Sequence, residues 1–289
     1  MTFHQILHIV RHGLSDSLKV LPFLFVTYLL MELLEHKAGE RVQGAIAKAG
    51  KAGPLVGGAL GLVPQCGFSA VAAGLYAGRV VSVGTVLAVF LSTSDEMLAV
   101  FLGESVPVSK ILTVLGLKLV IATLVGFAAD LLLRKHARPL HVEGFCEGEH
   151  CHCERGVLRS ALHHTVHVFA FLVLVNLLLG ALLELVGEDA LAALMRDTPV
   201  LGECIAALVG LIPNCAASVA IATLYAKGVI SAGAMLAGLL TGAGTGLLVL
   251  FRTNRSLREN LLFPLALLAV GVLFGTLLNL TGLGAALGL

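Results

Sequence analysis

The sequence contains few charged residues. Lys, Arg, Asp and Glu together make up 13% of the 289 residues, whereas hydrophobic residues make up 57%. Soluble globular domains carry about a quarter charged residues, so this composition excludes that class and indicates an integral membrane protein. The net charge is only +1, which argues against a nucleic-acid partner. The polar–apolar alternation of membrane-spanning strands is also missing, so we expect an all-α fold in a lipid bilayer.

Motifs that would indicate other classes of protein are absent as well. The first residues, MTFHQILHIVRHG, contain no continuous apolar region followed by a small-residue cleavage site, so we expect the first helix to be retained. No H-E-x-x-H or other nucleophile–base motif is present, so we predict a protein that is not an enzyme and has no resident cofactor. The six cysteines are interpreted as thiols, because disulfide frameworks are typical of small secreted domains.

Long apolar segments fill most of the chain and recur at a fixed spacing. The stretch 261–280 can cross roughly 30 Å of hydrocarbon as a helix. At an offset of 149 positions (213 − 64 = 149), GLVPQC at 61–66 aligns with GLIPNC at 210–215. Duplicated membrane units of this kind are usual in secondary transporters. Each half is predicted to contain a first helix, an interrupted segment, a third helix and a fourth helix, at 14–34, 53–78, 80–103 and 108–133, then at 161–186, 200–227, 229–251 and 260–280.

Three loops are clearly basic, namely 35–52, 134–159 and 252–258. The positive-inside rule assigns such loops to the cytoplasm. All three share one side only if 53–78 and 200–227 enter the membrane and return without crossing it. That leaves three crossings per half and inverts the second half. We therefore predict two inverted repeats in the cytoplasmic (inner) membrane, each with three spanning helices and a proline-broken re-entrant hairpin, or ten helical segments in total.

The predicted division of the chain is 1–133 for the first transmembrane repeat, 134–159 for a cytoplasmic loop rich in His and Cys, and 160–289 for the second repeat. Arg11 and Lys19, at the expected outer end of the first helix, run against this orientation.

The two proline motifs predict a cavity in the middle of the membrane. Proline donates no backbone hydrogen bond and disfavours helix in the residue before it, so Pro64 and Pro213 each end one short helix and begin another. Irregular backbone at this depth is tolerated only where it lines protein or water. With both prolines in the first turn of the outgoing helices, the N–H groups of 66–68 and 215–217 are expected to face the cavity. The predicted substrate ligands are Gln65, Cys66, Ser69, Asn214, Cys215 and Ser218.

The alternative is a pair of plain proline kinks with inert cysteines. The recurrence of proline, amide, cysteine, serine and tyrosine in both halves disfavours it.

The predicted third helix of the first half contains two acidic residues, Asp95 and Glu96, within an apolar segment. The aligned positions in the second half are Gly244 and Thr245, which carry no charge. Ionisable groups at this depth cost several kcal/mol and are functional by default, so we predict a proton or coupling-ion site in one half only. Lys118 on the next helix is either the ion-pair partner of these carboxylates or a side chain that extends its ammonium to the membrane surface.

Candidate metal ligands occur on the first helices and in the central loop. His12 and Asp16, and likewise His163 and His167, are four residues apart and therefore share a helical face, although an interfacial polar cluster explains them equally well. The loop adds ligands for soft or borderline ions, Cys146, His150, Cys151, His152 and Cys153. Without spaced C-x2-C pairs, this tract is interpreted as a flexible ion trap, with a plain solvated linker as the alternative.

The run VPQCGFSA…GLYAG…TSDE and its repeat IPNCAASVA…TLYAKG resemble the ten-transmembrane heavy-metal exporter family, whose members carry the names arsenic efflux protein or manganese transporter. A looser likeness extends to the organoarsenical efflux permeases. The resemblance covers nearly the whole chain except the His/Cys loop. It implies a multi-pass permease that exports a metal or metalloid ion.

The chemistry of the predicted ligands narrows the substrate only in part. Cys66 and Cys215 favour a thiophilic species such as trivalent arsenic, whereas Gln65, Asn214 and the acidic pair would suit a hard ion such as Mn²⁺. We favour the thiophilic substrate with protons as the coupling ion. An intramembrane metalloenzyme using His163, His164, His167 and Asp95 is the alternative from another class. A membrane sensor that works through the loop 136–156 is a further one.

Overall fold

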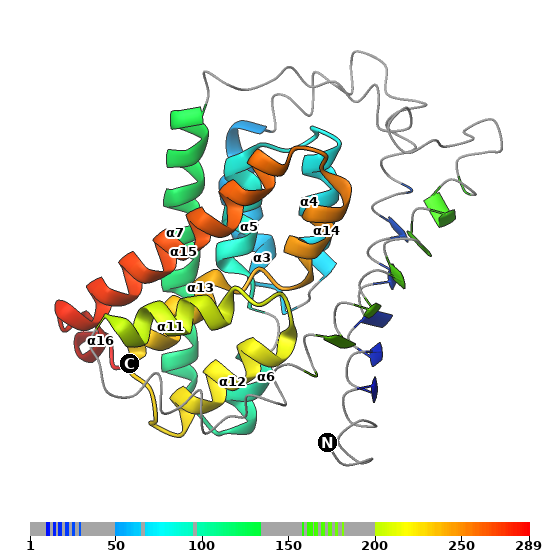
Figure 1. Cartoon of the computed structure of the whole chain (residues 1–289). Helices are drawn as coiled ribbons and strands as arrows, with labels where there is room; N and C mark the ends of the chain where they lie inside the picture. Colours follow the sequence, from blue (N-terminus) through cyan, green and yellow to red (C-terminus); the bar gives the residue numbers. More distant parts are fainter. Residues whose placement is uncertain are drawn as a thin grey trace.

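The computed structural model describes residues 50–64, 67–94, 97–133 and 200–289, together with scattered helical positions between 10 and 29 and between 158 and 181. Within this part of the chain every regular element is a helix, which confirms the predicted all-α class (Figure 1). The helices of the first half are η1 (Gly50–Ala52), α3 (Gly53–Gly61), α4 (Gly67–Ala77), α5 (Val83–Ser92), α6 (Met97–Gly103) and α7 (Val108–Leu133). Those of the second half are α11 (Leu201–Gly210), α12 (Cys215–Ala226), α13 (Ala232–Thr241), α14 (Thr245–Thr253), α15 (Leu257–Leu280) and α16 (Leu283–Ala286).

The longest helices, α7 and α15, fall where the apolar runs predict the fourth helix of each half. The bounds of α7 are those predicted, and α15 begins three residues earlier than expected, at Leu257. With 26 residues, α7 is about 39 Å long, which exceeds the hydrocarbon thickness of about 30 Å. Four helical stretches among the described residues are long and apolar enough to cross a membrane: Val83–Gly103, Val108–Leu133, Ala232–Thr253 and Leu257–Leu280.

Serine side chains fix where the third helix of each half begins. Ser82 caps α5 and Ser231 caps α13, and each Oγ accepts a hydrogen bond at 3.1 Å, from the N–H of Thr85 and of Ala234 respectively. These serines satisfy N–H groups that the first turn of a helix leaves without a partner. The two serines are 149 positions apart, which is the offset of the repeat, so the third helix begins at the same aligned position in both halves.

The third helices are not continuous, which corrects the prediction of unbroken helices at 80–103 and 229–251. The first helix stops at Ser92 and resumes at Met97, and the second stops at Thr241 and resumes at Thr245. Thr93 leaves the helical region with ψ 125°, and Gly244 adopts φ 55° and ψ −147°, a conformation that side chains disfavour. Near both breaks, a threonine hydroxyl donates a hydrogen bond to a backbone carbonyl of the preceding helical turn. The Thr93 and Thr241 hydroxyls donate to the carbonyls of Val89 and Ala237.

The same packing contacts occur in both halves. Helix α5 packs between α3 and α7, as α13 packs between α11 and α15. A Cβ atom on Gly84 would overlap the carbonyl oxygen of Gly126, and one on Gly233 would overlap that of Gly275. Small residues at a helix interface allow such close backbone approach in membranes. The glycine pairs also lie 149 positions apart, so the close contact belongs to the repeated unit.

A polar contact at the end of each fourth helix repeats in atomic detail. The Asp130 carboxylate accepts hydrogen bonds from the Gly84 N–H at 2.8 Å and the Ser82 hydroxyl at 2.7 Å. At the aligned positions, the Asn279 side chain accepts from the Gly233 N–H at 3.0 Å and donates to the Ser231 hydroxyl at 2.8 Å. Each contact ties the end of the fourth helix to the start of the third.

The half-helices that follow the breaks pair across the two halves. Helix α4 packs against α14 and helix α12 packs against α6, and both pairs lie side by side in Figure 1. Helices α5 and α13 meet between them. Each half therefore contributes two half-helices to contacts with the other half, and the breaks gather around the middle of the molecule.

Candidate substrate site at the helix breaks

Two predicted ligands from different halves flank the same break, between α13 and α14. A Cβ atom on Gly246 would lie 2.6 Å from the Ser69 Cβ, so α4 touches the first turn of α14. A Cβ atom on Gly242 would lie 3.3 Å from the Ser218 Oγ, which belongs to α12. Ser69 is 1% exposed. The segment 242–246 thus lies between a serine of the first half and a serine of the second half.

Asn214 lies in the break between α11 and α12 and is buried. Its N–H donates to the Ile212 carbonyl at 2.7 Å, and its carbonyl accepts from the Ala217 N–H at 3.2 Å. Helix α12 therefore begins at Cys215, two residues after Pro213, and α4 begins three residues after Pro64. This corrects the expectation for Pro213, which precedes the first turn of α12; residues 65 and 66, which follow Pro64, lie outside the described residues. The Ala217 N–H, expected to face the cavity, is already used by Asn214.

Lys118 ties the two halves together at the level of the breaks. Its side chain is fully buried, and its ammonium donates to the carbonyl of Thr93 and, at 2.9 Å, to the carbonyl of Leu239. Carbonyl groups at helix C-terminal ends carry partial negative charge, which favours a cation. The ammonium does not reach the aqueous phase in this conformation. The aligned residue in the second half is Leu267, which is buried and apolar, so the contact has no equivalent there.

Thr245 is a buried polar residue of the site that the sequence analysis did not include among the ligands. It is 1% exposed, and its hydroxyl has no hydrogen-bond partner among the described residues. It begins α14, and its aligned residue in the first half is Glu96. The signal in the sequence was this alignment with Glu96, an ionisable residue within an apolar segment.

Many of the predicted site residues lie outside the described residues, and their placement stays a prediction. These are Gln65, Cys66, Asp95, Glu96, His12, Asp16, His167, Cys146, His150, Cys151, His152 and Cys153. The backbone of Cys215 begins α12, but its side chain is likewise outside the description. His163 lies exposed on a helical stretch. In the described part of the chain no three His, Cys, Asp or Glu side chains come close enough to hold a metal ion.

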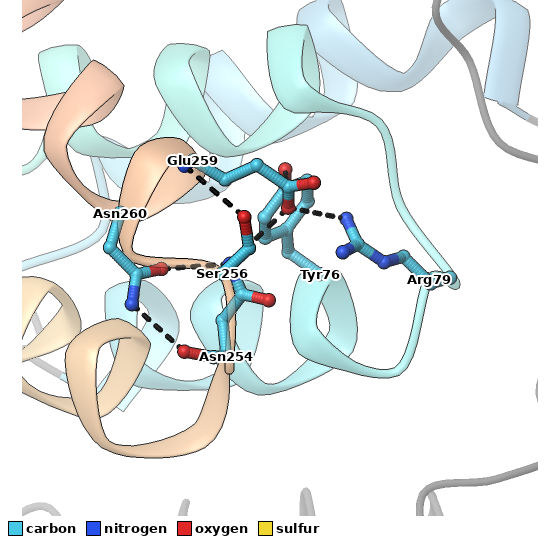
Figure 2. Close-up of polar contacts among 6 residues, drawn as sticks. All are labelled: Tyr76, Arg79, Asn254, Ser256, Glu259 and Asn260. Carbon is cyan, nitrogen blue, oxygen red and sulfur yellow. Dashed lines mark hydrogen bonds and ion pairs between the residues drawn. The ribbon is translucent and has the colours of Figure 1, made fainter.

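A second polar cluster joins the C-terminal end of α4 to the segment between α14 and the first turn of α15 (Figure 2). Arg79, in the loop after α4, forms an ion pair with Glu259 at 2.8 Å, and the Tyr76 hydroxyl donates to the same carboxylate oxygen at 3.0 Å. Asn254 donates to Glu259 at 3.3 Å and to the Asn260 side chain at 2.7 Å. Burial lowers the pKa of the Arg79 guanidinium, but the hydrogen bond and charge of Glu259 raise it above its ordinary value. No motif in the sequence predicts this cluster.

The apolar helices, the breaks in their middle and the contacts between halves define a multi-span α-helical membrane protein of the transporter class. The chain belongs to the family described as "Putative, 10TM heavy-metal exporter", whose family model matches residues 5–195. This confirms the resemblance to that family. The matched residues include the first proline motif at 61–66 and the His/Cys loop and end before the second motif at 210–215, whereas the resemblance was expected to cover nearly the whole chain except that loop. No curated protein and no solved structure matches the chain.

Proposed function

We propose that the protein is a secondary permease that exports a heavy metal or metalloid ion through a site formed by the helix breaks. The observation that carries this proposal is the position of Ser69 and Ser218, which come from different halves and flank the same break at 242–246. Transporters built from repeats bind their substrates where broken helices of the two repeats meet. Family membership supports the export of a heavy metal.

An inverted arrangement of the two halves is part of the proposal. The contact of Asp130 with Ser82 lies close in sequence to Arg79, which pairs with Glu259 in the first turn of α15. The equivalent contact of Asn279 lies at the opposite end of that same helix, 24 residues long. The two aligned contacts thus belong to opposite faces, which we call the Asp130 face and the Asn279 face. The loop 252–258 lies on the Asp130 face, and the basic segment 134–159 follows α7 directly after its end at Leu133, which supports a cytoplasmic assignment of this face.

The proposed substrate ligands are Cys66 and Cys215, with Gln65, Ser69, Asn214 and Ser218 around them. Trivalent arsenic and similar thiophilic species bind thiolates, so two cysteines at aligned breaks support such a substrate. A hard divalent cation such as Mn²⁺ is the second candidate, because the amides and the nearby Asp95 and Glu96 offer oxygen ligands.

The substrate is tested by transport into everted membrane vesicles, with either arsenite or Mn²⁺ added to the external medium. We expect pH-gradient-driven arsenite accumulation with wild-type protein. Cys66→Ser and Cys215→Ser should each abolish this accumulation. The control is Cys204→Ser, which removes a thiol on α11 outside the proposed site and should leave accumulation unchanged. Accumulation of Mn²⁺ that survives both substitutions would overturn the thiophilic site. Chemical conversion of the substrate without accumulation would favour the metalloenzyme alternative.

Proton coupling is assigned to Asp95, next to Glu96 and close in sequence to Thr93, whose carbonyl accepts from Lys118. In the same vesicles, Asp95→Asn should retain arsenite binding, measured by calorimetry in detergent, but lose transport driven by the pH gradient. Loss of binding with pH-dependent exchange retained would make Asp95 a substrate ligand and would favour the hard cation.

A further inference from the structure

Arg79 adopts a backbone conformation that normally belongs to glycine. It closes the C-terminal end of α4 with φ 59°, and its N–H donates to the Tyr76 carbonyl at 2.8 Å. At the aligned position of the second half, Gly228 closes α12 with φ 69° and donates to the Tyr225 carbonyl at 2.9 Å. Glycine is the usual residue for this helix ending, and a residue with a Cβ atom is strained there. An arginine at this position therefore indicates a use for its side chain.

The side chain of Arg79 links the two halves. Its guanidinium reaches Glu259 of the second half, and both side chains are only about a quarter exposed, at 25% and 26%. The guanidinium carbon also lies 5.1 Å from the centre of the Tyr76 ring, which packs edge-on against Phe263 at 5.2 Å. Figure 2 shows the Arg79 and Tyr76 side chains converging on Glu259. Partial burial, and a second hydrogen bond from Tyr76 to the same carboxylate oxygen, give this pair more weight than an exposed surface ion pair.

On the opposite face, the described residues form no such link. The residues aligned with Arg79 and Glu259 are Gly228 and Lys110, which cannot form an ion pair. The aligned tyrosine, Tyr225, contacts Phe101 of α6 with ring centres 5.8 Å apart. Its hydroxyl is buried and has no hydrogen-bond partner among the described residues. Aromatic contact thus joins α12 and α6, whereas a charge pair also links the end of α4 to the first turn of α15, the helix that follows α14.

We infer that Tyr76, Arg79 and Glu259 form a latch that closes the central site toward the Asp130 face, and that this face opens when α4 separates from α14. Both helices start at a break beside the site; α4 ends at the latch, and Asn254, directly after α14, donates to Glu259, so separation of the two helices would connect the site to that face. Among the described residues no ion pair links α6 to α12 on the opposite face. The inference rests on the proposed transport function for its biological meaning, but its test does not require a substrate.

The test uses a buried reporter cysteine at each face. Ala73 on α4 is fully buried in the cluster that contains Leu247 of α14, and its aligned residue Ala222 on α12 is fully buried in the cluster that contains Phe101 of α6. Labelling of Ala73→Cys or Ala222→Cys by a membrane-impermeant maleimide is measured in sealed vesicles of both orientations. The same protein without the reporter supplies the background from native cysteines.

We expect Arg79→Gly to raise the labelling rate of the Ala73→Cys reporter about tenfold from the Asp130 face, because it removes the latch and leaves the helix ending unstrained. The Ala222→Cys reporter should not gain reactivity. Asp130→Asn, which alters a contact within one half on the same face, is the matched control and should leave both rates unchanged. Exchange of the charges, Arg79→Glu with Glu259→Arg, should restore slow labelling.

An unchanged labelling rate in Arg79→Gly, in protein that elutes as a single species from size exclusion, would overturn the latch even if arsenite transport is intact. Equal increases at Ala73→Cys and Ala222→Cys would also overturn it, because they would indicate general loosening. Faster labelling confined to the Asp130 face, in a protein that transports neither arsenite nor Mn²⁺, would instead leave the latch standing and remove the proposed function.

Discussion

The two halves of the protein share their packing but differ in their charges. The capping serines, the close glycine pairs and the contact at the end of the fourth helix occur at aligned positions in both halves. Lys118, Arg79 and the acidic pair Asp95 and Glu96 occur in the first half alone, opposite Leu267, Gly228, Gly244 and Thr245. The difference teaches that the repeated positions supply the packing contacts of both halves, whereas these charged groups occur in one half alone.

Even the shared contact differs in its charge. In the first half the carboxylate is Asp130 itself, whereas in the second half the aligned Asn279 donates to a separate carboxylate, Glu203. Glu203 is buried, and its second oxygen has no hydrogen-bond partner among the described residues. The aligned residue in the first half is Pro54, which supports the N-terminal turn of α3. Each of these two contacts thus includes one carboxylate, which comes from α7 in the first half and from α11 in the second half.

The largest effect is expected from Lys118, compared with its aligned residue Leu267. Lys118→Met leaves the carbonyls of Thr93 and Leu239 without their buried donor, at about 1–3 kcal/mol for each unsatisfied group. Leu267→Met conserves volume and should cost less than about 1.5 kcal/mol. Denaturation in detergent measures both, and vesicle transport should be lost in the first variant only. A Lys118→Met protein as stable as wild type would indicate that the burial cost of the ammonium equals the gain from its bonds.

A smaller and equal effect is expected from the two close glycine contacts. Gly84→Ala and Gly233→Ala each place a methyl group against a backbone carbonyl, of Gly126 and Gly275 respectively, and overpacking of this kind costs about 1–3 kcal/mol. The control is Gly116→Ala on the exposed side of α7, where a Cβ atom meets nothing within 4 Å. It should be neutral or slightly stabilising, because alanine favours helix over glycine. Unequal effects at Gly84 and Gly233 would show that the scaffold is less symmetric than its contacts.

The sequence predicted the features that depend on local chemistry. Proline cannot continue a helix, so the breaks after Gly61 and Gly210 were predictable, as were the uninterrupted apolar runs of α7 and α15. The breaks after Ser92 and Thr241 were not, because Ser, Thr and Gly are also tolerated inside membrane helices, where hydroxyl groups bond their own backbone.

The contacts between the two halves could not be predicted from the sequence, for a different reason. Arg79 and Glu259 are 180 positions apart (259 − 79 = 180), whereas the repeat relates positions 149 apart. The repeat predicts which residues occupy equivalent positions, and it does not predict which residues of different halves touch. The groups of Thr93 and Leu239 that accept from Lys118 are backbone carbonyls, which no side-chain pattern reveals.

The smallest effect is expected from the aligned tyrosines, and it isolates the difference between the two faces. Tyr76→Phe removes the hydroxyl that donates to Glu259 at 3.0 Å, and a hydrogen bond to a charged group contributes about 1.5–3 kcal/mol when buried and less at this exposure. Tyr225→Phe removes a buried hydroxyl that has no partner among the described residues, so it should be neutral or stabilising. Both variants keep the aromatic ring, so the contacts of Tyr76 with Phe263 and of Tyr225 with Phe101 remain.

Thermal denaturation of the two tyrosine variants, each alone and combined with Glu259→Gln, gives the decisive comparison. The loss from Tyr76→Phe should shrink in the Glu259→Gln background, because the two groups interact, while the effect of Tyr225→Phe should add independently. Coupling of Tyr225 to Glu259 as strong as that of Tyr76 would contradict an ion-pair link confined to the Asp130 face.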